Sequence, residues 1–154
     1  MKIGVIGAGV MGAGIAQAFV VVSDYRVVVC DITVELAANG KQKIAINLEK
    51  LVQKGKMEQA ALEAALSRVE TGLVEQVADC DLVIEATIEK MELKKSVFAQ
   101  LQTVCKQECI FATNTSSLSI TELSRGLDRP VIGMHFFNPA PVMKLVEVIA
   151  GLFT

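Results

Sequence analysis

The glycine-rich segment GAGVMG, at residues 7–12, constrains the fold of this chain more than any other feature. It follows the short apolar run KIGVIG and opens VMGAGIAQAFVV, which has the pattern of a helix. In this setting the first glycine permits a tight turn, the second lets a pyrophosphate approach the backbone, and the third lets helix and strand pack closely. Free N–H groups at the start of the helix would then face phosphate oxygens. The segment therefore predicts a strand, a phosphate-binding turn and a helix, in that order.

A carboxylate is found where the second strand is expected to end. The apolar run RVVVCD covers residues 26–31, and Asp31 follows the last glycine of the motif by 19 positions. A carboxylate at this place accepts a hydrogen bond from a ribose 2′-OH and repels a 2′-phosphate, which favours NAD over NADP. The alternative is a glycine turn and a strand-end acid in a sheet that binds no nucleotide. The predicted cofactor-binding residues are Gly7, Ala8, Gly9, Val10, Met11, Gly12 and Asp31.

Apolar runs that alternate with helical patterns predict an α/β fold with a doubly wound, mostly parallel sheet. Strands are expected at 2–7, 26–31, 81–86, 109–114, 130–137 and 143–149. Helices are expected at 10–21, from a cap at Thr33 to Gly55, at 57–69 and at 91–105. We expect residues 1–154 to form one nucleotide-binding domain. Because the chain stops just after an apolar run, VEVIAGLFT, we expect a further domain to be missing.

Charge and composition argue against several classes of protein. The net charge is −2, which does not favour binding to nucleic acid or to a membrane surface. No apolar run reaches the ~18 residues that a membrane span needs. The four cysteines form no CxxC pair and have no histidine nearby, so we expect no metal site and reduced thiols in a cytoplasmic protein.

Polar side chains follow several of the expected strands, at 85–89, 114–117 and 135–138. In an open α/β sheet, ligands bind at the carboxyl ends of the strands. His135, the single histidine of the chain, lies at this edge and could exchange a proton near neutral pH. If residues 138–141 turn the chain back, Glu147 could approach it, orient the ring and stabilise the imidazolium. The alternatives are that His135 is a packed structural residue and that Glu147 points into solvent.

Three lysines share one face of the long expected helix. Lys43, Lys50 and Lys54 are spaced seven and four residues apart, roughly opposite the apolar stripe of the helix. A solvated face is the more common explanation for such spacing. The alternative is a clamp for a substrate that carries phosphate groups.

Four segments resemble the 3-hydroxyacyl-CoA dehydrogenases, and the bacterial 3-hydroxybutyryl-CoA dehydrogenases of butyrate-type metabolism in particular. They are IGAGVMGAGIAQAF, DLVIEATIEKMELKK, ATNTSSLSITELS and VIGMHFFNPAPVMKLVEVI. The resemblance covers essentially the whole chain, but only the N-terminal, NAD-binding Rossmann domain of the family. It implies hydride transfer between C3 of an acyl-CoA and NAD, with acetoacetyl-CoA or 3-hydroxybutyryl-CoA as substrate. It also implies a homodimer or larger homo-oligomer for the full-length protein.

The resemblance also implies roles for single residues. Ser116 matches the serine that binds the substrate's 3-oxygen, His135 matches the catalytic base, and Glu147 matches its partner. Glu89 and Lys94 match positions that contact NAD, and Asn114 matches a residue beside the nicotinamide. Lys50 and Lys54 match helix lysines that approach the phosphates of CoA. The expected substrate-binding residues are Ser116, Lys50, Lys54 and Asn138.

The chain departs from the family's sequence in two respects. Thr113 stands where the family often has serine, and the segment VVSDYR at 21–26 stands where a glycine commonly precedes the second strand. The family's C-terminal helical domain, with a further catalytic asparagine and most of the dimer contacts, is not part of this chain. One alternative is therefore an isolated NAD-binding module that turns over little substrate. Another is a two-domain dehydrogenase for a small hydroxy acid or sugar acid, although HFFNPAPVMKLVEV favours the acyl-CoA class.

Overall fold

A computed structural model describes residues 1–22 and 24–154. Its strands form one seven-stranded sheet in the order β3-β2-β1-β4-β5-β6-β7. All neighbours pair in parallel except β6 and β7, which are antiparallel. The predicted doubly wound, mostly parallel α/β fold is confirmed. The strands are β1 (Lys2–Ile6), β2 (Arg26–Cys30), β3 (Val69–Gly72), β4 (Leu82–Glu85), β5 (Ile110–Thr113), β6 (Val131–Phe136) and β7 (Val146–Ile149).

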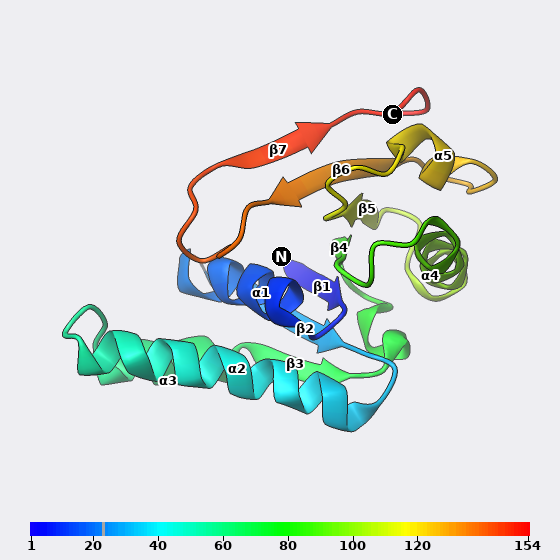
Figure 1. The fold of residues 1–154 in the computed structure, drawn as a ribbon. Helices are drawn as coiled ribbons and strands as arrows, with labels where there is room; N and C mark the ends of the chain where they lie inside the picture. Colours follow the sequence, from blue (N-terminus) through cyan, green and yellow to red (C-terminus); the bar gives the residue numbers. More distant parts are fainter. Residues whose placement is uncertain (23) are drawn as a thin grey trace.

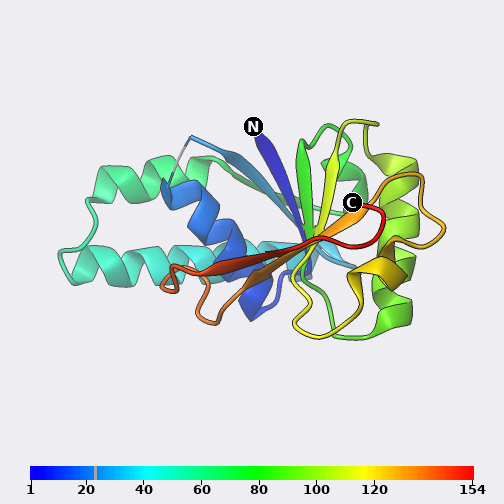
Figure 2. The ribbon, with the colours of Figure 1, turned by 90° about the horizontal axis from the view of Figure 1, so that it is seen from above.

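Helices cover both faces of the sheet, as Figures 1 and 2 show. One face carries α1 (Val10–Val22), α2 (Val34–Gln53) and α3 (Gln59–Ser67). The other face carries α4 (Met91–Val104), α5 (Ile120–Ser124) and the 3₁₀ turn η1 (Val74–Val77). Among the helices that the structure describes, none has the length and apolar character of a membrane span.

The central strands are apolar from end to end because both of their faces are covered. Ile3 and Val5 of β1 point toward α1–α3 and pack there with Ile15 and Leu48. On the opposite face Val83 of β4 belongs to a second cluster, which includes Phe98 of α4 and Phe111 of β5. These two cores hold the carboxyl ends of β1, β2, β4 and β5 at one common edge.

Local signals set the ends of the long helix α2. The hydroxyl of Thr33 accepts a hydrogen bond from the Leu36 N–H at 3.2 Å, which caps the first turn as predicted. The helix ends at Gln53, and Gly55 follows with a φ of +65°, a conformation that glycine adopts readily.

The structure also contains elements that the sequence did not predict. The expected helix at 57–69 ends at Ser67, and Val69 already begins strand β3, which pairs in parallel with β2. A strand of only four residues, VETG, carries little periodicity, and its partner lies about forty residues away in the sequence. The short elements η1 and α5 were missed for the same lack of periodicity. Strand β7 begins at Val146 rather than at 143, because a turn at 140–142 reverses the chain first.

Candidate functional site

The three glycines of the first loop occupy three different environments. Gly7 has a φ of +103°, in the left-handed region where other residues are strained. A Cβ atom at Gly12 would lie 1.7 Å from the carbonyl oxygen of Gly7, so helix α1 can approach the loop only with glycine here. A Cβ at Gly9 would meet nothing within 4 Å, so this position faces open space. The left-handed turn at Gly7, the open space at Gly9 and the close packing at Gly12 agree with the three roles expected from the motif.

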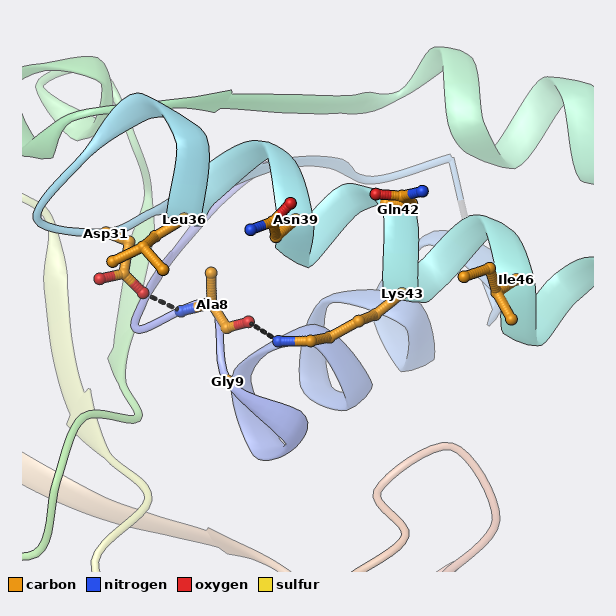
Figure 3. A pocket seen from close by; sticks show the side chains of 8 residues that line it. All are labelled: Ala8, Gly9, Asp31, Leu36, Asn39, Gln42, Lys43 and Ile46. Carbon is orange, nitrogen blue, oxygen red and sulfur yellow. Dashed lines mark hydrogen bonds between the residues drawn. The ribbon is translucent and has the colours of Figure 1, made fainter.

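The peptide of Ala8, between the first two glycines, is held from both sides (Figure 3). Oδ2 of Asp31 accepts a hydrogen bond from the Ala8 N–H at 2.7 Å, and Oδ1 accepts one from the Ile32 N–H at 2.8 Å. The ammonium of Lys43 donates to the Ala8 carbonyl at 2.9 Å. Asp31 therefore orients the loop in addition to its predicted contact with a ribose. The ammonium of Lys43 is thus bound to the loop through one of its three donors, and its part in the hypothesised phosphate clamp stays a prediction.

A largely apolar cleft of about 780 Å³ lies beside this loop, between the carboxyl ends of β2 and β4. The apolar residues Ile32, Leu73 and Ile88 line it together with Gly9 and Asp31. An apolar slot suits a planar base, the carboxylate suits a ribose, and the open glycine turn at a helix N-terminus suits a pyrophosphate. The residues present therefore fit an adenine dinucleotide.

A second pocket lies at the carboxyl ends of β4, β5 and β6 and contains His135. Nδ1 of His135 lies 2.8 Å from Oε2 of Glu147. The two residues are directly opposite each other in the antiparallel pairing of β6 and β7, and this register brings them together. The ring of Phe137 packs against the imidazole, with centroids 4.7 Å apart. The predicted approach of Glu147 to His135 is confirmed, and Nε2 is the ring nitrogen that remains for a ligand.

The loop after β5 brings further predicted residues into the same pocket. Asn114 accepts a hydrogen bond from the Phe136 N–H at 2.8 Å through Oδ1, which ties this loop to the end of β6. Ser116 donates its N–H to Oε1 of Glu89 at 3.1 Å. The pocket therefore brings together seven of the predicted residues from separate segments of the chain: Met11, Glu89, Lys94, Asn114, Ser116, His135 and Asn138.

Lys94 makes a contact that the sequence did not predict. Its ammonium lies 2.8 and 2.9 Å from the two carboxylate oxygens of Glu85, and the two side chains are 1% and 0% exposed. The same ammonium is 3.3 Å from Oε2 of Glu89. In the sequence, Glu85 is distinguished only as part of the polar segment 85–89. The available signal was that a carboxylate ends the otherwise apolar strand LVIE, as Asp31 follows RVVVC.

Glu89 stands at the boundary between this buried pair and the pocket. Burial raises the pKa of its carboxyl group, but hydrogen bonds from the Thr115 hydroxyl and the Ser116 N–H, together with the Lys94 ammonium, outweigh burial and lower the pKa below its ordinary value. Glu89 is therefore ionised near neutral pH, when it can accept several hydrogen bonds at once.

The remaining candidates lie outside this pocket. Lys50 and Lys54 are exposed on α2 and at its end, and their contact with CoA phosphates stays a prediction. All four cysteines are buried and free. Burial raises the pKa of the Cys30 and Cys80 thiols to about 12, which makes them poor nucleophiles.

Comparison with known proteins gives a consistent result. The family model described as "3-hydroxyacyl-CoA dehydrogenase, NAD binding domain" matches residues 2–154. A 3-hydroxybutyryl-CoA dehydrogenase from Clostridioides difficile is 48% identical, over 100% of this chain and 56% of that relative. The crystal structure of an (S)-3-hydroxybutyryl-CoA dehydrogenase from Ralstonia eutropha superposes with a TM-score of 0.95 at 42% identity, over 99% of this chain and 55% of that one. The chain thus spans about half the length of these relatives.

Proposed function

Because this chain belongs to the 3-hydroxyacyl-CoA dehydrogenase family and matches its NAD-binding domain, we propose that the full-length protein interconverts a 3-hydroxyacyl-CoA and a 3-oxoacyl-CoA. The relatives from Clostridioides difficile and Ralstonia eutropha are named for 3-hydroxybutyryl-CoA, and this compound with acetoacetyl-CoA is the proposed substrate pair. The observation that carries the proposal is the contact between Glu147 and His135, a histidine that lines one pocket with Ser116 and Asn114.

His135 is the proposed acid and base of the reaction. Its Nδ1 is held by Glu147, so Nε2 is the nitrogen that takes the proton from the substrate's 3-hydroxyl group. Glu147 keeps the ring in this orientation and stabilises the imidazolium that results. In the reverse direction the imidazolium returns the proton to the 3-oxygen. NAD, when bound, would accept the hydride that leaves C3 of the substrate.

The other residues are proposed to bind and orient. The hydroxyl of Ser116 holds the 3-oxygen, and Asn138 lines the same pocket on the substrate side. Asn114, fixed by its bond to the Phe136 N–H, lies beside the nicotinamide. Lys50 and Lys54 approach the phosphates of CoA. We also propose that the full-length protein is a homodimer or larger homo-oligomer.

The direct test is the reduction of acetoacetyl-CoA by NADH in the full-length protein, followed at 340 nm. A general base contributes about 10²–10⁴ to the rate, so His135→Gln should lower kcat by that factor. NADH affinity should stay close to that of the parent, because the pocket's cofactor side is untouched. Normal turnover in His135→Gln would exclude His135 as the acid and base.

A second candidate function concerns the 154-residue chain on its own. It spans 56% of its Clostridioides difficile relative, so it could act as an NAD-binding module with little turnover. The same assay with the chain alone and with the full-length protein distinguishes the two cases. NADH binding without acetoacetyl-CoA reduction by the chain alone would support the module.

A further inference from the structure

We propose that Glu85 is a positioning residue for this pocket: through Lys94 it fixes the carboxylate of Glu89, which in turn holds the backbone of Ser116. The proposal rests on the proposed function and assigns a part in it to a residue that does not line the pocket. Its evidence is a continuous set of contacts from the end of β4 to the loop after β5.

The carboxylate of Glu85 is completely buried, and both of its oxygens are occupied. Oε1 accepts hydrogen bonds from the N–H and from the hydroxyl of Thr87, each at 2.6 Å. Oε2 accepts one from the hydroxyl of Thr113 at 2.7 Å. Together with Lys94, these donors satisfy the carboxylate and hold it rigidly. Because an unpaired charge at such depth is strongly unfavourable, Lys94 and Glu85 depend on each other.

The ammonium of Lys94 lies between a buried carboxylate and a partly exposed one. Beyond its two short contacts with Glu85, it lies 3.3 Å from the carbonyl oxygen of Thr87 and 3.3 Å from Oε2 of Glu89. An ammonium has three donors, and these acceptors account for them. The side chain of Glu89 is 41% exposed, and the ammonium that contacts its Oε2 has its place determined by Glu85.

The second oxygen of Glu89 organises the loop after β5. Oε1 accepts hydrogen bonds from the Thr115 hydroxyl, from the Ser116 N–H at 3.1 Å and from the Ser117 hydroxyl at 3.4 Å. The Thr113 hydroxyl, which donates to Glu85, also accepts a hydrogen bond from the Thr115 N–H at 3.3 Å. The Glu85–Lys94 pair is thus connected to the segment around Ser116 through Glu89 and also through Thr113. Thr113 has the hydroxyl group that a serine at this position would also supply.

Glu85→Gln tests this arrangement with little change of shape. The amide can still contact the neighbouring threonines, but it no longer balances the charge of Lys94. The ammonium is then left with Glu89 as its carboxylate partner and should draw it away from Ser116. Glu89 and Lys94 match positions that contact NAD, so their displacement should lower NADH affinity about tenfold or more, as expected for the loss of one charged hydrogen bond.

Leu101→Ala is the matched control for lost stability. Leu101 is fully buried in the same helix, two turns from Lys94, and none of the contacts above involves it. Both variants should lower the melting temperature of the chain. NADH affinity, measured by fluorescence titration well below that temperature, should fall in Glu85→Gln and be unchanged in Leu101→Ala.

Equal NADH affinity in the parent and in Glu85→Gln, or an equal loss in both variants, would overturn the proposal. Thr113 provides a second pair of variants if Glu85→Gln does not fold. Thr113→Ser keeps the hydroxyl and should bind NADH like the parent, whereas Thr113→Val removes it and should bind more weakly. The absence of this difference would also overturn the proposal.

A parent chain that does not bind NADH would refute both this inference and the cofactor premise of the proposed function. A normal NADH affinity in Glu85→Gln would refute the inference alone.

Discussion

Asp31 should determine the preference for NADH through two separable contacts. Its Oδ2 already accepts the Ala8 N–H at 2.7 Å, a charge-assisted hydrogen bond worth about 1.5–3 kcal/mol. We expect the same carboxylate to accept a hydrogen bond from the ribose 2′-OH of the cofactor. A 2′-phosphate with a charge near −2, at about 5 Å, would instead be repelled by about 2–7 kcal/mol for effective dielectric constants between 80 and 20. The lower figure, about 1.7 kcal/mol before rounding, alone predicts a preference for NADH over NADPH of about 17-fold.

Two substitutions separate these contacts. Asp31→Asn removes the charge but keeps an oxygen that can accept the Ala8 N–H, so the gap between NADH and NADPH should narrow with a moderate loss of NADH affinity. Asp31→Ala removes the anchor of the loop as well and should bind NADH more weakly than Asp31→Asn. Fluorescence titration of both nucleotides at fixed ionic strength measures each effect. Equal affinity of the parent for NADH and NADPH would show that Asp31 does not set the preference, as would an unchanged ratio of the two affinities in Asp31→Ala.

Two further predictions concern the glycine-rich loop and helix α2. Gly12→Ala would place a Cβ 1.7 Å from the Gly7 carbonyl oxygen, so it should lower both the melting temperature and NADH affinity. Position 9 faces open space, so Gly9→Ala should weaken NADH binding with little change in melting temperature. Equal melting temperatures for the two variants would contradict this. Lys43→Met removes the bond to the Ala8 carbonyl and should weaken NADH binding a few-fold. Lys50→Met in the full-length protein should raise the KM for the acyl-CoA and leave NADH affinity unchanged. Weaker NADH binding in Lys50→Met, with a raised acyl-CoA KM in Lys43→Met, would contradict the roles given to these two lysines.

The fold was largely predictable because its signals are local. An apolar run that ends in glycine, a carboxylate after the second strand and alternating helical patterns were sufficient to predict a parallel, doubly wound sheet. Strand β3 was missed because its pairing with β2 is not encoded within Val69–Gly72 itself. The helix expected at 57–69 ends earlier, at Ser67, because the pairing of β3 with β2 takes over from Val69.

The site was predictable where one segment carries the signal, and less so where two segments must meet. The spacing of twelve residues between His135 and Glu147 allowed a contact, but only the register of β6 and β7 makes them direct neighbours. Glu85 and Lys94 belong to different elements, and neither residue alone indicates a buried ion pair. Lys43 shares a helix face with Lys50, yet the nearby Ala8 carbonyl gives it a different contact.

In the proposed function, the cofactor and His135 act on one substrate at the same edge of the sheet. A crystal structure of the full-length protein with NAD and acetoacetyl-CoA bound together would test this arrangement directly. We expect the 3-oxygen of the ligand within about 3.2 Å of Nε2 of His135, with the nicotinamide on the side of Asn114. A nicotinamide bound away from His135, or an imidazole that contacts no atom of the acyl group, would contradict it.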